Sequence, residues 1–64
     1  MFSDLDLVTP VRALSVDGRR VPPGKVGTVI YAWDGGAEVE FVAESGEAKI
    51  ASVADSDVVR LAER

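Results

Sequence analysis

The stretch VGTVIYAWDGGAEVEFV, residues 26–42, decides the fold of this chain. Its first part, residues 26–33, is rich in β-branched and aromatic side chains and predicts a strand. The Asp-Gly-Gly of residues 34–36 accepts the positive φ angles of a tight hairpin turn. Residues 37–42 alternate between apolar and polar positions, which is typical of a strand with one buried face. The stretch therefore predicts an antiparallel β-hairpin.

The second strand of this hairpin assigns its two faces clearly. Strict alternation places Val39 and Phe41 toward a core and Glu38 and Glu40 toward solvent. These side chains predict a sheet that is buried on one side only.

The first strand is apolar on both of its alternating sets, so its faces are harder to assign. In a small barrel only one set can point inward. We expect Val29 at the mouth of the barrel and, after a twist, Ile30 and Ala32 in the core. This arrangement leaves Tyr31 and Trp33 at the surface.

The residues before the hairpin explain how the chain enters it. Pro22-Pro23-Gly24 has the composition of a type II turn, and the prolines stiffen this end of the loop. Gly27 follows at the start of the strand, where a bulge or a close backbone crossing tolerates only glycine.

Further strands are predicted on both sides of the hairpin, over residues 7–14, 48–53 and 58–61. A long loop of residues 15–25 with an Asp-Gly turn signal joins the first two strands, and residues 54–59 can form one short helical turn. Short connections favour antiparallel neighbours, and five short strands protect their edges by curling into a barrel.

The whole chain, residues 1–64, is predicted to be one all-β domain. Its expected core consists of apolar side chains from all five strands. These are Leu7, Val11, Val26, Val29, Ile30, Val39, Phe41, Ile50, Val53, Val59 and Leu61.

The composition excludes several classes of site. The chain has no cysteine and no histidine, so it offers neither a disulfide framework, nor a thiolate metal site, nor the commonest general base. The Asp-Ser-Asp of residues 55–57 lacks the pattern of a calcium loop and is expected to be a helix cap. We expect no cofactor and no metal. The acidic N-terminus resembles no signal peptide and no run spans a membrane, which predicts a soluble cytoplasmic protein.

Charge is unevenly distributed along the chain, although the net charge is −4. Residues 12–25 hold four basic residues and one acid, whereas residues 34–63 hold eight acids and two basic residues. An acidic body disfavours a phosphate backbone as partner, and a basic loop on it suits a partner of mixed charge.

The spacing Gly-Lys-Val-Gly-Thr-Val at residues 24–29 resembles that of KOW and related SH3-like barrels. More closely, the run over residues 6–61 looks like the bacterial domain-of-unknown-function family 4926. The likeness rests on Asp-x-Val at 6–8, Gly-x-Val-Gly-Thr at 24–28 and Glu-Val-Glu-Phe at 38–41. The resemblance implies a single five-stranded antiparallel SH3-like barrel, with a long first loop and a short 3-10 turn before the last strand. It assigns no activity. An antidote or immunity role beside a neighbouring gene product, and RNA or ribosome contact of the KOW type, are functions that it implies.

Catalysis is not expected. Glu38 and Glu40 would lie about 7 Å apart on one strand face, a spacing at which paired carboxylates can do glycosidase chemistry. A solvated outer face explains them better, because so short a chain has little room for a cleft beside its core. The serines have no histidine to activate them. We predict that the chain is not an enzyme.

We predict instead a binding module that docks on another protein, encoded nearby in one version of the hypothesis. In SH3-like barrels the long first loop and the next hairpin turn lie beside one groove, which here are residues 15–25 and 33–37. For Trp33, a role in the interface and a role as a cap on its own barrel both stay open. Alternatives are RNA binding through the basic loop, including Lys25, and a structural homodimer that pairs exposed sheet edges. The predicted partner-binding residues are Arg19, Arg20, Tyr31, Trp33, Asp34, Glu38 and Glu40.

Overall fold

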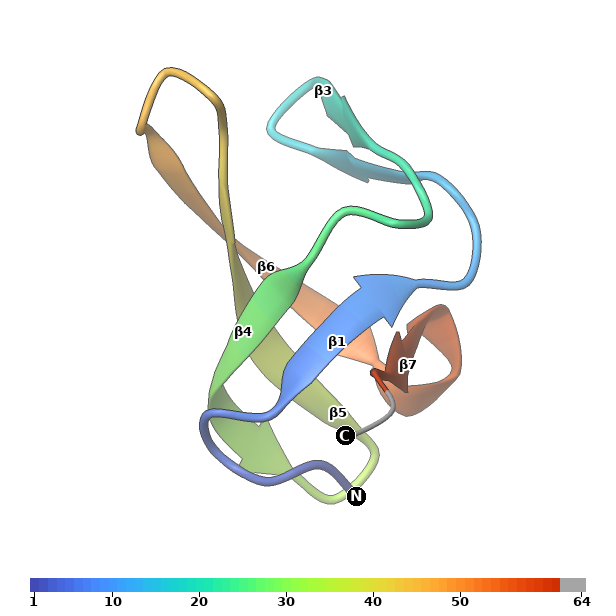
Figure 1. Ribbon diagram of the computed structural model, residues 1–64. Helices are drawn as coiled ribbons and strands as arrows, with labels where there is room; N and C mark the ends of the chain where they lie inside the picture. The colour runs from blue at the N-terminus through green and yellow to red at the C-terminus, as the bar shows by residue number, and fades with distance from the viewer. Residues whose placement is uncertain (62–64) are drawn as a thin grey trace.

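The computed structural model describes residues 1–61, which form an all-β protein with one 3-10 turn (Figure 1). This confirms the predicted fold class. The 3-10 turn, η1 (Asp55–Asp57), stands directly before the last strand, where a short helical turn was expected. The strands are β1 (Leu7–Pro10), β2 (Leu14–Val16), β3 (Arg19–Val21), β4 (Gly27–Trp33), β5 (Gly36–Val42), β6 (Ala48–Ala54) and β7 (Val58–Arg60).

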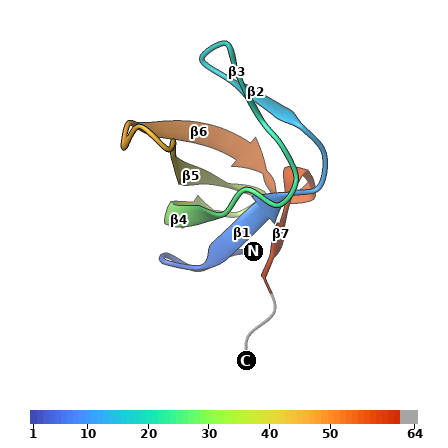
Figure 2. The ribbon, with the colours of Figure 1, turned by 45° about the horizontal axis from the view of Figure 1, so that its top comes forward.

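Five of the strands form one antiparallel sheet in the order β6-β5-β4-β1-β7, and β2 and β3 form a separate hairpin. The sheet curls strongly (Figure 2). It stays open, because no pairing within the described residues joins β6 to β7. The three residues of β7 all pair with β1, and β7 follows β6 through η1. The structure therefore has the predicted antiparallel pairing without the predicted closed barrel.

The strand predicted over residues 7–14 is divided into β1 and β2, and the predicted loop 15–25 contains β3. Pro10 ends β1, since it has no N–H to continue the ladder. Asp17 and Gly18 both have positive φ angles, 52° and 78°, which is the requirement of a type I′ hairpin turn. The Asp-Gly signal thus closes a β-hairpin inside the segment that was expected to be a loop.

The observed core differs from the predicted one, because several residues expected to point inward point outward or lie outside the strands. Val29, Val39, Phe41 and Val53 are buried as predicted. Other predicted core residues are exposed or only half-buried, namely Leu7, Val11, Val26, Ile30, Ile50, Val59 and Leu61. The remaining buried apolar side chains come from Val8, Pro10, Val16, Val21, Ala37 and Val58.

This difference has a simple geometric reason in each strand. Val8 and Val58 point inward, so their neighbours in β1 and β7 must point outward. Ile50 lies opposite Glu40, on the outer face of the sheet. Val11 and Val26 lie outside the strands altogether.

Gly27 stands on β4 where side chains of β5 leave no space for a Cβ atom. A Cβ atom at Gly27 would lie 2.5 Å from Val39 Cγ1 and 2.6 Å from Phe41 Cε1. These side chains occupy the space that any other residue would need. The expectation that only glycine fits here is confirmed, and the cause is close packing.

A bulge at Ile30 interrupts β4. Val29 pairs with Val39 and Tyr31 with Glu38, so Ile30 has no partner across the β4–β5 ladder. The extra residue reverses the alternation of faces. As a result Ala32 packs against the core, while Tyr31 is turned outward.

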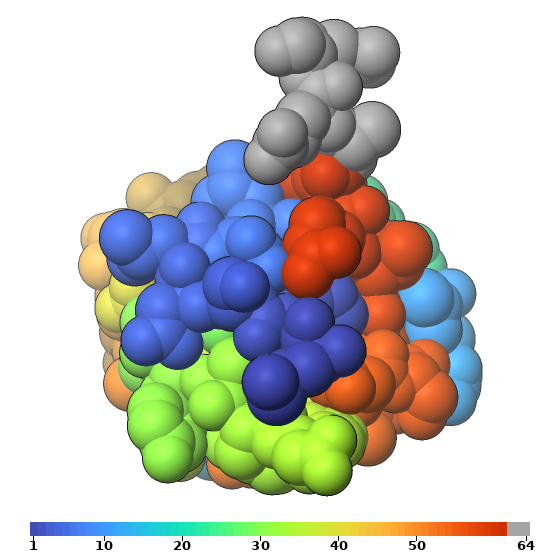
Figure 3. Space-filling view, turned by 90° about the horizontal axis from the view of Figure 1, so that it is seen from below, coloured from blue at the N-terminus to red at the C-terminus, as the bar shows by residue number. Residues whose placement is uncertain are grey.

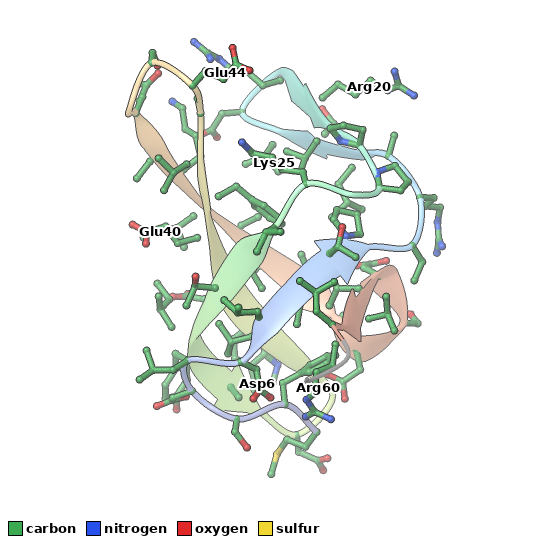
Figure 4. All side chains as sticks on the ribbon, in the orientation of Figure 1. Asp6, Arg20, Lys25, Glu40, Glu44 and Arg60 are labelled. Atoms are coloured by element: carbon green, nitrogen blue, oxygen red, sulfur yellow. The ribbon has the colours of Figure 1, made fainter. Side chains whose placement is uncertain are left out.

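The N-terminal segment before β1 lies between the β4–β5 turn and the last strand, β7 (Figure 3). Asp6 Oδ2 accepts a hydrogen bond from the Ser3 N–H at 2.8 Å and two from Arg60, at 3.1 Å from Nε and 2.9 Å from Nη2 (Figure 4). The hydrogen bond from Ser3, followed by that from Arg60, holds the pKa of Asp6 below its ordinary value. The Arg60 guanidinium also lies 5.3 Å from the centre of the Phe2 ring.

We predict that Gly27→Ala destabilises the fold by about 1–3 kcal/mol, the usual cost of overpacking a core. Val39 and Phe41 are both buried and have no room to withdraw. Urea denaturation followed by circular dichroism measures the change. Gly18→Asn is the control, because a side chain at Gly18 would meet nothing within 4 Å and asparagine tolerates its positive φ. Equal stability of Gly27→Ala and the wild type would contradict the close packing.

We predict that Asp6 makes the fold sensitive to acid. A carboxyl whose pKa is lowered on folding stabilises the protein above its unfolded pKa, about 4. That contribution is lost as the pH falls through the lower, folded value. The free energy of unfolding should therefore fall less steeply with acid in Asp6→Asn than in the wild type. Asp34→Asn is the matched control, since Asp34 makes no side-chain hydrogen bond within residues 1–61. Parallel pH profiles for Asp6→Asn and the wild type would refute this role.

Candidate functional site

The structure separates the predicted partner-binding residues into two groups at opposite ends of the molecule (Figure 1). Arg19 and Arg20 lie on β3, at the end that holds the β5–β6 turn, whereas the β4–β5 turn with Asp34 lies at the other end. The expected meeting of residues 15–25 with residues 33–37 is therefore not seen. The other group follows the β4–β5 hairpin and consists of Tyr31, Trp33, Asp34, Glu38 and Glu40.

The β2–β3 hairpin is held on the core by the buried Val16 and Val21, and two exposed ion pairs lie beside this contact. Arg19 Nη2 is 3.4 Å from Glu47 Oε1, and Lys49 Nζ is 3.8 Å from Asp17 Oδ2. Both pairs join the hairpin to the β5–β6 region. They connect residues about thirty positions apart in the chain, which sequence spacing alone does not reveal.

The outward side chains of β4, β5 and β6 form a continuous surface, which we call the acidic-aromatic face. Its cross-strand rows follow from the register. Thr28 is paired with Glu40 and Glu40 with Ile50, while Tyr31 is paired with Glu38 and Glu38 with Ser52. Figure 4 shows Glu40 pointing away from the ribbon. The face is defined by Thr28, Tyr31, Trp33, Glu38, Glu40, Ile50 and Ser52.

Two aromatic residues mark one side of this face. Tyr31 is 59% exposed and Trp33 is 36% exposed, and their ring centroids lie 6.0 Å apart. The indole of Trp33 covers Gly36 on the neighbouring strand, where a Cβ atom would lie only 2.9 Å from Trp33 Nε1. Trp33 is therefore held against the outside of the sheet, with part of its surface left for contact.

The charged residues of the acidic-aromatic face are both acids, Glu38 and Glu40. Glu38 and Glu40 make no ion pair within residues 1–61, and neither does Asp34 in the adjacent turn. Lys49 is the one basic residue in β4, β5 or β6, and it lies opposite Phe41 on the inner face. Lys49 therefore does not share a surface with the two glutamates, because its position on β6 turns it to the opposite face.

A groove of about 260 Å³ lies at the opposite end, between the β2–β3 hairpin and the β5–β6 turn. We call it the basic groove. Sequence analysis identified the basic loop and missed the groove, because Phe41 and Lys49 join the loop only through the fold. Its lining consists of Val16, Arg19, Arg20, Val21, Pro22, Lys25, Phe41, Ala43, Glu44 and Lys49.

The two glutamates of the acidic-aromatic face stand side by side on an outward sheet surface, and neither lines the groove. In the part of the chain that the structure describes, no cluster of three or more acidic side chains is placed to hold a metal ion. No helix over residues 1–61 has both the length and the apolar character needed to cross a membrane.

Comparison with known proteins gives no relative: no family model, no curated protein and no solved structure matches this chain.

We predict that Trp33→Ala leaves the protein folded, at a cost of about 1 kcal/mol, typical of a substitution outside the core. Phe41→Ala should remove most of the stability of so small a domain, because a buried phenylalanine contributes about 3–5 kcal/mol. Thermal and urea denaturation of both variants measures the difference. Loss of the fold in Trp33→Ala would show that the indole belongs to the core.

Proposed function

We propose that this protein is a non-catalytic binding module that docks on a partner protein through its acidic-aromatic face. The observation that carries the proposal is the exposed pair of Tyr31 and Trp33 beside two carboxylates, Glu38 and Glu40, that make no ion pair within the described chain. Aromatic residues at a surface dominate the energetics of protein interfaces. Unpaired carboxylates around them select a partner of opposite charge.

The chemistry of the face specifies a basic partner surface. Tyr31 and Glu38 are direct cross-strand neighbours, so one arginine from a partner can pair with the carboxylate while its guanidinium lies over the phenol ring. Ile50, 54% exposed, extends the apolar area beside Glu40. The partner therefore combines arginine or lysine side chains with apolar residues.

An antidote role is the specific form of this proposal. An acidic face that covers the basic, nucleic-acid-like site of a neighbouring gene product would inhibit that product by occupying its site. The curled sheet and η1 before β7 are the features on which we base an SH3-like arrangement.

Docking on protein is favoured over RNA binding because the two features that RNA requires are separated. Single-stranded RNA is held by aromatic side chains that stack on bases beside basic side chains that contact phosphates. Here Tyr31 and Trp33 lie on one surface and Arg19 and Arg20 on another. Phe41, the aromatic residue of the basic groove, is only 3% exposed.

The test is affinity capture from native lysate at low and moderate salt, with and without nuclease. Three tagged proteins are compared: the wild type, Glu38→Lys with Glu40→Lys, and Arg20→Ala with Lys25→Ala. We expect one protein that survives nuclease, is captured by the wild type and by the arginine–lysine variant, and is lost from the glutamate variant. Trp33→Ala should lose it as well.

Other results would assign the function elsewhere. Nucleic acid or ribosomes that disappear with nuclease would favour RNA binding. A partner that binds all the variants equally would exclude the acidic-aromatic face. A concentration-dependent dimer with no captured partner, measured by sedimentation, would favour pairing through the sheet edges β6 and β7.

A further inference from the structure

The basic groove is built over the core itself. Val16, Val21 and Phe41 are buried core residues, and all three line the groove together with Pro22 and Ala43. The β2–β3 hairpin forms one wall and the beginning of the β5–β6 turn forms the other. The floor is therefore apolar and held in place by packing beneath it.

Basic side chains surround this floor. Lys25 lines the groove and makes no ion pair within residues 1–61 (Figure 4). Arg19 and Lys49 line it as well and pair with acids of the surrounding segments, whereas the side chain of Arg20 points away from the β5–β6 turn. Glu44 is the one acid in the lining. On a chain with a net charge of −4, three basic side chains around an apolar groove indicate an anionic ligand.

Glu47 already shows how a carboxylate is held at this rim. Its Oε1 is 3.4 Å from Arg19 Nη2 and its Oε2 is 3.4 Å from Lys49 Nζ, so one carboxylate bridges two lining cations. Both distances exceed the 2.7–2.9 Å of a strong charge-assisted hydrogen bond. The side chain of Glu47 is 50% exposed, and exposed ion pairs contribute little to stability. Another carboxylate can therefore displace it.

We propose that the basic groove binds an acidic peptide segment of another protein, and that Glu47 is an internal competitor for the position of the ligand carboxylate. The volume of about 260 Å³ lies below that of pockets for drug-sized molecules and suits one aliphatic or aromatic side chain. The ligand is thus an apolar residue flanked by aspartate or glutamate. The apolar side chain lies on the floor, and the flanking carboxylates pair with Lys25 and, after Glu47 is displaced, with Arg19 and Lys49. This second site is independent of the acidic-aromatic face.

Fluorescence anisotropy with two labelled peptides tests the proposal. The probe is Asp-Glu-Leu-Asp-Glu, and its uncharged counterpart is Asn-Gln-Leu-Asn-Gln. We expect the acidic peptide alone to bind, more weakly as salt is added. Arg19→Ala with Lys25→Ala should weaken binding about tenfold or more, because each removes a charge-assisted contact. Glu47→Gln should tighten it about twofold to fivefold, the scale of an exposed ion pair. Asp34→Asn is the matched control with the same charge change in the β4–β5 turn, and it should leave the affinity unchanged.

Chemical-shift mapping keeps binding distinct from unfolding in these variants. Val16, Val21 and Phe41 should shift when the acidic peptide is added, in the wild type and in Glu47→Gln. Failure of both proteins to bind would overturn the proposal, as would full affinity in the variant that lacks Arg19 and Lys25. Equal affinity of the wild type and Glu47→Gln would exclude internal competition by Glu47. Tighter binding of a single-stranded RNA oligomer than of the peptide would assign the groove to phosphate instead.

Discussion

The bulge at Ile30 in β4 is the constraint on which the rest of this small protein depends. Without the extra residue, the alternation that turns Gly27 and Val29 inward would turn Tyr31 and Trp33 inward as well. Two large rings would then compete with Val39 and Phe41 for a core that already has no room for a Cβ atom at Gly27. The bulge places Ala32 toward the core instead. The same backbone irregularity thus makes the interior small enough to pack and places an aromatic pair outside the sheet.

The second consequence is a division of charge between two surfaces. The outward face of β4, β5 and β6 has acids and aromatic residues, whereas the groove at the β2–β3 hairpin has basic side chains around an apolar floor. Phe41 links the groove to the core, because it packs against Gly27 on one side and lines the groove on the other. A single five-stranded sheet with one added hairpin therefore presents two surfaces that would select partners of opposite charge.

The features that could be predicted from the sequence are those that depend on residues close together in the chain. The alternation of β5, the outward position of Tyr31 and the close approach at Gly27 could all be inferred from the sequence, because each depends on neighbouring residues. The inward faces of β1 and β7 could not, since their adjacent valines and leucines are equally apolar and only the register selects between them. The contact of Arg19 with Glu47 joins segments that are distant in the chain. For this reason residues 15–25 were predicted beside the β4–β5 turn, whereas they lie beside the β5–β6 turn.

The bulge in β4 is tested most directly by the solvent accessibility of single cysteines introduced along this strand. The chain has no cysteine of its own, so the reagent reacts only with the introduced thiol. Tyr31→Cys, Ala32→Cys and Trp33→Cys would each be treated with a thiol reagent under native conditions, and the modification rates compared with those in urea. The bulge predicts rapid modification at positions 31 and 33 and slow modification at position 32. Protection at 31 and 33 with rapid modification at 32 would show that β4 alternates without a bulge, and that the aromatic pair belongs to the core.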